Sequence, residues 1–261
     1  MSGNKTMYFT GLNKEMLQGA KYAVLPGDPK RAKILGEYLD NNSEFLCANR
    51  QHASYIADIS GEKVVVVSTG MGSPAISIAA EELAKLGVKY FIRLGTSGAI
   101  QDNIELGDIV ISRAAVKLDG ASSQYAPREY PAVASFGLTQ SFIEGAKKNN
   151  IPYHIGITAS SDTFWPGQER YDNFSGYLLR QFKGSIKEWH ALNVSNFEME
   201  ASALFTLCSV FNLDAACFCG IIAKRGESEK PDLNGKTRAQ LNWQKTLKAG
   251  LCFDMGKRGL I

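Results

Sequence analysis

The sequence predicts an α/β protein, a single domain built as a three-layer α/β/α sandwich with a central mixed, largely parallel sheet. Two observations predict this class. Apolar runs of strand length alternate with amphipathic helical stretches from one end to the other, which calls for a sheet covered by helices on both faces. The 261 residues, 44% of them hydrophobic, suffice for one large core but not for two ordinary domains joined by a linker.

The first half of the chain alternates in this way. Tyr22–Leu25 is a short strand that stops at the turn formers of residues 26–29. Tyr55–Ile59 and Val64–Ser68 flank a polar, Gly-bearing run and predict a β-hairpin. Pro74 opens a helix that reaches about Leu86, because its apolar residues recur at helical spacing.

The middle of the chain continues the alternation. Tyr90–Leu94 is the next predicted strand, and we expect it to end at the Gly-rich run Gly95–Gly98. Ile109–Ala114 follows as another strand. Thr139–Asn149 is an amphipathic helix that leads to a strand over His154–Ser160.

The last third predicts a helix over Met199–Phe211 and a buried strand over Ala215–Ala223. Residues 226–235 are polar and carry Gly and Pro, so we expect a loop, followed by a final helix from about Arg238 to Leu251. Sites in sheets of this kind gather at the carboxyl ends of the strands.

Composition argues against several classes of protein. The net charge is +3, from 29 basic and 26 acidic residues without a dense basic tract, so nucleic acid is not an expected partner. The N-terminus lacks the apolar core of a signal peptide, and the apolar runs are too short to span a bilayer, so no membrane is expected. Five cysteines, odd in number and mostly in apolar segments, predict reduced thiols in a cytoplasmic protein. The three histidines are scattered, so no metal site is expected.

Glycines and cations at strand ends predict an anion site. Gly27 and Arg31 follow the first strand, while Arg93 and Thr96 belong to the run around residues 93–98. Glycine permits close backbone approach, and a guanidinium binds phosphate in a bidentate fork. Plain turns remain the alternative, and neither Gly-rich run has dinucleotide-binding or P-loop spacing.

Two further segments carry candidate binding groups. Glu198, Met199 and Glu200 lie at a strand-to-helix transition, where the carboxylates either grip a diol or simply suit a helix N-terminus. Gln168 and Arg170 can together match the O2, N3–H and O4 edge of uracil, and Phe164 can stack on it; an ordinary surface loop is the alternative.

Seven motifs, in order, resemble the uridine phosphorylase branch of the hexameric nucleoside phosphorylases. They cover most of the chain, from about Gly11 to Arg225, and are VLPGDPKRA, STGMGSP, RLGTSGAIQ, KLDGAS, TASSDTFWPGQERY, FKGS and NFEMEA. The GQER run is specific to the pyrimidine enzymes. The purine enzymes carry a catalytic Asp after the late strand, where this chain has Ile221–Arg225. A purine leaves more easily when an acid protonates N7, an atom that uracil lacks.

The resemblance implies phosphorolysis of uridine to uracil and ribose 1-phosphate, without a cofactor and with inorganic phosphate as co-substrate. It implies a cytoplasmic homo-oligomer, a hexamer formed as a trimer of dimers with active sites at the dimer interface. The implied phosphate-binding residues are Gly27, Arg31, Arg93, Thr96 and, from the neighbouring subunit, Arg50. The implied ribose-binding residues are Phe9, Thr96, Glu198, Met199 and Glu200. The implied uracil-binding residues are Ser97, Gly98, Phe164, Gln168, Arg170, Ile222 and Arg225. Catalysis would rest on Arg93, Gln168, Arg170 and Glu200.

Two departures from the family pattern stand out. Relatives place a His near residue 9 that crosses to the partner's site and meets the 5′-hydroxyl, whereas this chain has Phe9. The positions at which some relatives bind a monovalent cation hold Gln51 and Ala75, so we expect that site to be absent. Another nucleoside phosphorylase, a nucleosidase that uses water, and a nucleoside-binding protein without turnover remain the alternatives.

Overall fold

The computed structural model describes residues 5–225 and 232–261. Its strands belong to one sheet, with the order β10-β6-β8-β9-β5-β1-β4-β3-β2 and β7 paired to β6. The strands are β1 (Tyr22–Pro26), β2 (Glu44–Asn49), β3 (His52–Ile59), β4 (Glu62–Val67), β5 (Tyr90–Ala99), β6 (Ile109–Leu118), β7 (Ala132–Val133), β8 (Tyr153–Ser161), β9 (Val194–Glu198) and β10 (Asp214–Lys224).

The sheet is mixed, as predicted, and part of it closes on itself. Because β10 pairs with β5 as well as with β6, the strands β5, β10, β6, β8 and β9 form a ring. Among the described residues, five pairings are parallel (β1–β4, β1–β5, β10–β5, β6–β8, β8–β9) and five are antiparallel. The antiparallel pairings are β2–β3 and β3–β4 in the meander, β10–β6 and β5–β9 in the ring, and β6–β7.

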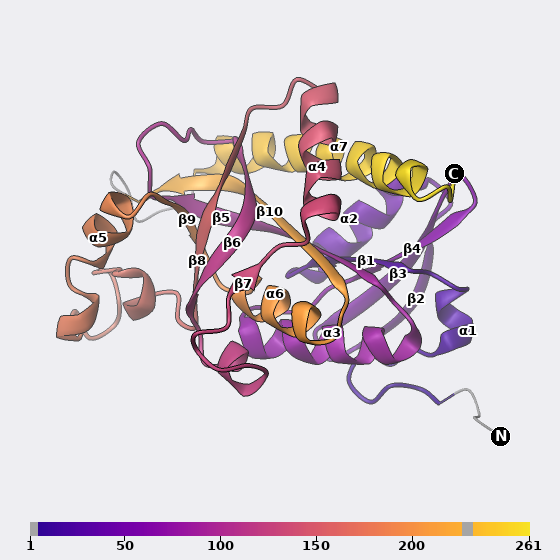
Figure 1. Cartoon of the computed structure of the whole chain (residues 1–261), viewed down its shortest axis with the longest axis horizontal. Helices are drawn as coiled ribbons and strands as arrows, with labels where there is room; N and C mark the ends of the chain where they lie inside the picture. Colours follow the sequence, from indigo (N-terminus) through magenta and orange to yellow (C-terminus); the bar gives the residue numbers. More distant parts are fainter. Residues whose placement is uncertain (1–4, 226–231) are drawn as a thin grey trace.

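Helices cover both faces of the sheet, which confirms the three-layer prediction (Figure 1). Tyr22 and Val24 of β1 pack in the cluster of α2, α4 and α7, while Ala23 and Leu25 pack in the cluster of α3 and α6. This alternation is what a strand buried on both faces requires. The helices are α1 (Lys14–Leu17), α2 (Pro29–Leu39), α3 (Ser73–Leu86), α4 (Phe136–Lys148), α5 (Ser185–Ala191), α6 (Ala201–Val210) and α7 (Leu233–Lys257).

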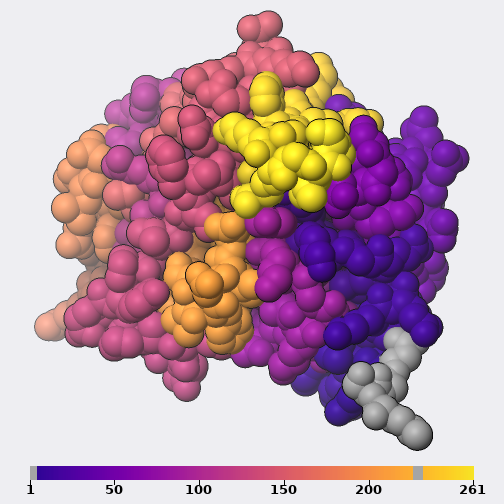
Figure 2. Space-filling model, turned by 45° about the vertical axis from the view of Figure 1, so that its right-hand side comes forward, coloured from indigo at the N-terminus to yellow at the C-terminus, as the bar shows by residue number. Residues whose placement is uncertain are grey.

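The C-terminal helix α7 packs along α4 and reaches α2, which links the two halves of the chain. In Figure 2 this yellow segment lies between the pink segment that contains α4 and the indigo and purple N-terminal part. The crossing of α4 and α7 is close because Gly145 faces Gly250, and a Cβ on Gly145 would lie 2.7 Å from the Gly250 nitrogen. No helix within the described ranges is both long enough and apolar enough to cross a membrane.

Several predicted bounds were wrong. β5 continues through Gly95–Ala99 and does not turn at Leu94, because β10 and β9 pair with it there. Helix α6 begins only at Ala201, since Glu200 is its N-cap. Helix α7 begins at Leu233, within the predicted loop 226–235, where Asp232 accepts a hydrogen bond from the Gly235 amide. Residues 226–231 of that loop lie outside the described residues.

The other predicted elements are confirmed with small shifts at their ends. The hairpin turn is Ser60-Gly61, whose φ angles of 55° and 97° are both left-handed, as a type I′ hairpin turn requires. Helices α1, α2 and α5 and strands β2, β7 and β9 were not predicted. The strands are short or polar, but the buried residues Ala32, Leu35 and Leu39 of α2 do recur at helical spacing, so that signal was overlooked.

Candidate active site

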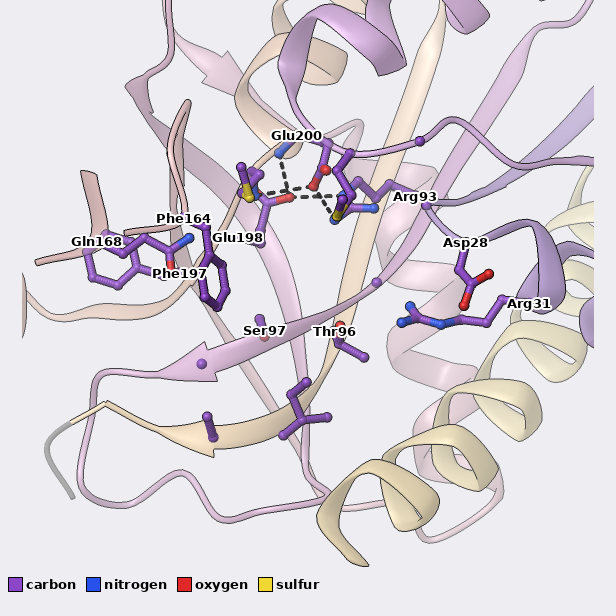
Figure 3. Close-up of a pocket in the computed structure, with 18 of the residues that line it drawn as sticks. Asp28, Arg31, Arg93, Thr96, Ser97, Phe164, Gln168, Phe197, Glu198 and Glu200 are labelled. Atoms are coloured by element: carbon purple, nitrogen blue, oxygen red, sulfur yellow. Dashed lines mark hydrogen bonds and ion pairs between the residues drawn. The ribbon is translucent and has the colours of Figure 1, made fainter. Parts of the chain in front are cut away.

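A cavity of about 490 Å³ lies at the carboxyl ends of the strands, where the sequence predicted the site. Figure 3 shows Asp28 and Arg31 at one end, Phe164, Gln168 and Phe197 at the other, and Arg93, Glu198 and Glu200 between them. The predicted site residues that line it are Gly27, Arg31, Arg93, Thr96, Ser97, Gly98, Phe164, Gln168, Arg170, Glu198, Met199, Glu200 and Ile222. Sequence reasoning missed Asp28, Pro29, Gly70, Met71, Gly95, Phe197 and Ala223.

The cationic end of the cavity is built by the turn between β1 and α2. Asp28 is the N-cap of α2, and its carboxylate accepts a hydrogen bond from the Lys30 amide over 2.8 Å. Burial lowers the pKa of Arg31 from its ordinary value, and the charge of Asp28 opposes that shift. At Gly27 a Cβ would lie 3.0 Å from the Gly70 carbonyl oxygen, so the two glycine loops approach closely only because this residue lacks a side chain.

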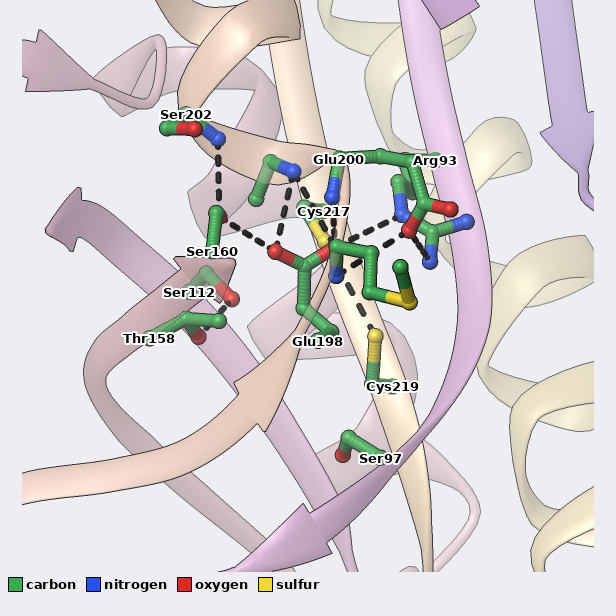
Figure 4. Close-up of polar contacts among 12 residues, drawn as sticks. Arg93, Ser97, Ser112, Thr158, Ser160, Glu198, Glu200, Ser202, Cys217 and Cys219 are labelled. Atoms are coloured by element: carbon green, nitrogen blue, oxygen red, sulfur yellow. Dashed lines mark hydrogen bonds and ion pairs between the residues drawn. The ribbon is translucent and has the colours of Figure 1, made fainter. Parts of the chain in front are cut away.

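Arg93 joins the two carboxylates at the centre of the cavity (Figure 4). Its Nε donates to Glu198 Oε2 over 2.9 Å, and its Nη2 forms an ion pair with Glu200 Oε2. Burial disfavours the charged guanidinium, but the two carboxylates outweigh burial and raise the pKa of Arg93 well above its ordinary value. Gly95 makes room for this arrangement, because a Cβ there would lie 2.8 Å from Arg93 Nη2.

Glu198 is held almost entirely by protein donors. Its carboxylate accepts hydrogen bonds from the amides of Glu200 and Ala201 and from the Ser160 hydroxyl. Ser160 in turn accepts a hydrogen bond from the Ser202 amide over 3.0 Å. Glu198 therefore anchors Arg93 to the N-terminus of α6, where a carboxylate also suits the helix dipole.

Glu200 is the carboxylate whose ionisation is most sensitive to its surroundings. Its Oε1 accepts a hydrogen bond from the Gly72 amide over 2.6 Å. Burial raises the pKa of Glu200 to about 7; the charge of Arg93 opposes this shift and the neighbouring Glu198 adds to it. A buried carboxylate beside a second one resists ionisation, so the upward direction follows from the geometry.

Beneath Arg93, Glu198 approaches two thiols on β10. One ligand atom each of Glu198, Cys217 and Cys219 lies within 4.8 Å of the others. The donor set does not suit a cation, because the Glu198 oxygens already accept several hydrogen bonds and Arg93 is adjacent. The hydrogen bond with Cys219, together with burial, also raises the pKa of the Cys217 thiol. The absence of a metal stays a prediction.

The other end of the cavity combines an amide, a guanidinium and aromatic rings. Gln168 is buried, and its backbone carbonyl accepts a hydrogen bond from Arg225 Nη2 over 2.7 Å. The guanidinium carbon of Arg170 lies 3.9 Å from the centroid of the Phe164 ring, a cation–π contact that orients both side chains. Arg225 does not line the cavity; it packs behind Gly98, where a Cβ would lie 2.8 Å from its Cδ.

Glu169, between the two candidate base-binding residues, points away from them. Its carboxylate accepts hydrogen bonds from the Gly184 and Ile186 amides and from the Ser185 and Tyr171 hydroxyls. Burial alone would raise the pKa of Glu169, but these donors outweigh burial and lower it. Glu169 therefore ties the segment that carries Gln168 and Arg170 to the start of α5.

Comparisons with known proteins show the family of this chain. Residues 21–249 match the family described as the phosphorylase superfamily. The chain belongs to the phosphorylase superfamily. It is 48% identical to a uridine phosphorylase of Haemophilus influenzae over 232 residues, which is 89% of this chain and 90% of the relative. It is 47% identical to one from Salmonella typhimurium and 46% identical to one from Escherichia coli, each over 90% of this chain and 91% of the relative.

Three predicted site residues of this superfamily member lie outside the cavity, namely Arg225, described above, and the pair Phe9 and Arg50. Phe9 and Arg50 contact one another on the surface, with the guanidinium carbon of Arg50 5.6 Å from the centroid of the Phe9 ring. Both were predicted to serve a neighbouring subunit, and both contact Tyr8, which precedes Phe9 in the N-terminal segment. The buried carboxylate of Glu82 holds this segment through the Phe9 and Thr10 amides.

The residues that sequence reasoning missed fall into two kinds. Gly70, Gly95 and Phe197 lie inside the quoted motifs, so their neighbours in sequence were the available signal. Asn196, Thr158 and Ser160 also lie inside the quoted motifs, but they form buried polar contacts behind the cavity wall, and a polar residue within a strand was the further signal there.

Proposed function

We propose that this phosphorylase superfamily member cleaves uridine with inorganic phosphate, forming uracil and ribose 1-phosphate. The observation that carries the proposal is one cavity with an arginine-rich anion end, a central carboxylate and an amide–guanidinium pair at the far end. The similar proteins named above are uridine phosphorylases, which supports the same reaction.

The three parts of the cavity suit the three parts of the reaction. Arg31, Arg93 and Thr96, with Gly27, bind phosphate, and Glu200 accepts hydrogen bonds from the 2′ and 3′ hydroxyls of the ribose above Met199. Gln168 and Arg170 stabilise the negative charge that gathers on uracil as the glycosidic bond breaks. The phosphate stabilises the oxocarbenium-like sugar and attacks C1′ from the opposite face.

Placing phosphate and nucleoside in line also removes much of the entropic barrier of a two-substrate reaction. Arg93 bridges the two sites, since its guanidinium lies beside Glu200 and lines the anion end. Glu198 contributes by holding Arg93, and Thr96, Ser97, Gly98 and Ile222 form the walls around sugar and base.

The base end favours a pyrimidine over a purine. The end of β10 supplies Ile222 and Ala223 to the cavity wall, and the acidic residues of the described lining are Asp28, Glu198 and Glu200. Asp28 lies at the opposite end of the cavity in Figure 3, and both Glu198 and Glu200 are paired with Arg93. An acid that protonates N7 of a purine leaving group is therefore missing from the described base end.

The remaining features are part of the same proposal. Residues 1–261 form one domain, the enzyme works without a cofactor and in the cytoplasm, and the homo-oligomer is a hexamer of three dimers. The surface position of Phe9 and Arg50 supports a site completed by the partner. Arg225 takes part in uracil binding through Gln168 and Gly98, and not by direct contact.

The deciding experiment measures release of free base from a panel of nucleosides with and without inorganic phosphate. We expect uracil and ribose 1-phosphate from uridine, only in the presence of phosphate, and little release from inosine or adenosine. Equal uracil release without phosphate would identify a nucleosidase. Tight uridine binding without any base release would identify a binding protein.

A further inference from the structure

A chain of buried polar side chains crosses the interior of the strand ring and ends at the cavity. It starts at Ser112 on β6, continues through Thr158 on β8 and Asn196 on β9, and reaches Ser97 on β5. The oxygens of Ser112 and Thr158 are 2.6 Å apart, Thr158 Oγ1 is 2.8 Å from Asn196 Oδ1, and Asn196 Nδ2 is 2.9 Å from Ser97 Oγ. Figure 4 shows the Ser112–Thr158 pair and Ser97 on their separate strands.

The orientation of the Asn196 amide gives this hydrogen-bonded series a direction, because each hydroxyl carries one proton. The Thr158 hydroxyl donates a hydrogen bond to the amide oxygen of Asn196, so the Ser112 hydroxyl must donate to Thr158. With its oxygen facing Thr158, the Asn196 amide turns its NH₂ group toward Ser97 and donates to it. Ser97 therefore accepts from behind, and its own proton has no acceptor among the described residues.

Ser97 lines the cavity beside Gly98, so its proton is available to a bound molecule. The opposite orientation of the Asn196 amide would take the Ser97 proton and leave only an acceptor facing the cavity. Because Asn196, Thr158 and Ser112 are all completely buried, water cannot supply a substitute partner. The direction of the chain thus decides which kind of hydrogen bond the cavity wall offers.

We propose that Asn196 is a positioning residue that makes Ser97 a hydrogen-bond donor to an acceptor oxygen of the bound nucleoside. Thr158 maintains this orientation by occupying the amide oxygen. The inference rests on the proposed function for its substrate. It adds that the Ser97 hydroxyl donates a hydrogen bond to the nucleoside and does not accept one from it.

The test is a set of double-mutant cycles with uridine and phosphate. S97A should lower kcat/KM by about tenfold, the range of one hydrogen bond lost in a buried site. N196D in its ionised form offers only acceptor oxygens and takes the Ser97 proton; because burial disfavours ionisation, it is assayed at rising pH, where its cost should approach that of S97A. T158V keeps the shape of the side chain, releases the amide orientation and should cost at least about threefold. In the S97A background, N196D and T158V should have almost no further effect.

Two controls separate this role from a structural one. T206V makes the same change at a buried threonine of α6 whose hydroxyl donates to the Ser202 carbonyl, and it should leave kcat/KM unchanged. The thermal unfolding midpoint of each variant shows whether it is folded under assay conditions. If N196D does not fold, the T158V cycle alone decides.

Losses for N196D or T158V that persist in full in the S97A background would overturn the proposal, because they would not act through Ser97. Wild-type levels of activity in S97A would overturn it too. Turnover of uridine by the unmodified protein is measured in the same assays, so failure of the proposed function would be recognised separately.

Discussion

Gln168, Glu169 and Arg170 are consecutive, yet their side chains serve different ends. Gln168 and Arg170 face the cavity, whereas Glu169 has a φ of 50° and turns its carboxylate toward the start of α5. Because the backbone of Glu169 is left-handed, its side chain points away from the side on which Gln168 and Arg170 lie. The local backbone therefore places the two groups proposed to bind the base on the same side.

Removal of the Gln168 amide tests its assignment. Gln168→Ala leaves one edge of uracil without a partner in a buried site, so kcat/KM for uridine should fall by roughly 100-fold or more. Steady-state kinetics with saturating phosphate measures this. A loss below about fivefold would mean that uracil is bound by other groups.

Glu200 predicts how nucleoside binding depends on pH. Only the ionised carboxylate can accept hydrogen bonds from both ribose hydroxyls, and burial raises the pKa of Glu200 to about 7. Affinity should therefore rise as pH increases through 7, and uridine should bind about tenfold more weakly at about pH 6 than at about pH 8. Calorimetric titration without phosphate avoids the ionisation of the co-substrate. Glu200→Gln should bind weakly and independently of pH; a pH profile shared with the unmodified protein would contradict the assignment.

Phe9 predicts weak recognition of the 5′-hydroxyl. Of its two neighbours, Thr10 is buried with its hydroxyl bound to Glu82, so Tyr8 is the one left to replace an imidazole. A neutral hydrogen bond is worth about 0.5–1.5 kcal/mol net, so kcat/KM for uridine and 5′-deoxyuridine should differ by less than about tenfold. Phe9→His should increase the preference for uridine. A preference beyond about 30-fold in the unmodified protein would show that another donor binds this hydroxyl.

At the scale of elements, the segment after β8 depends on one buried carboxylate. Residues 164–170 have little regular structure beyond the 3₁₀ turn Pro166–Gln168, and Glu169 ties them to Gly184, Ser185 and Ile186. The segment proposed to bind the base is therefore anchored to residues about 15 positions away in sequence.

Glu169→Ala should loosen this anchor. Its amide and hydroxyl donors would lose their acceptor, so we expect kcat/KM for uridine to fall at least about tenfold while phosphate binding changes little. Phosphate affinity from titration, beside uridine kinetics, distinguishes the two ends of the cavity. Equal losses in both would point to general unfolding; unchanged uridine kinetics would show that the segment needs no anchor.

At the scale of the whole molecule, the position of Arg50 predicts a shared active site. Arg50 is exposed beside Tyr8 and Phe9 and does not line the cavity of its own chain. If it completes the partner's phosphate site, a monomer should be inactive.

Mixing inactive Arg50→Ala and Glu200→Ala subunits should restore part of the activity. In a hybrid dimer one site receives an intact Arg50 from the Glu200→Ala chain and keeps its own Glu200. Subunit exchange is verified with differently tagged chains before the assay. No recovery after verified exchange would mean that Arg50 acts in its own chain or has no part in catalysis.

The sequence by itself determined the fold class, most strands and helices, and the strand ends at which the cavity lies. These features depend on residues close together in the chain: apolar periodicity, turn formers and caps act over one or two turns. The motif residues that line the cavity were predictable for the same reason, since each short motif follows one strand.

The tertiary structure decided which of these residues meet, and in which role. Arg93 pairs with Glu198 across 105 positions, and Asn196 reaches Ser97 across 99. β5 continues past its glycines because β10 and β9 pair with its backbone there. α7 contains Gly250 in its interior because α4 packs closely against it at that point. Local pattern does not encode such contacts, because they arise only when distant segments pack together and exclude water.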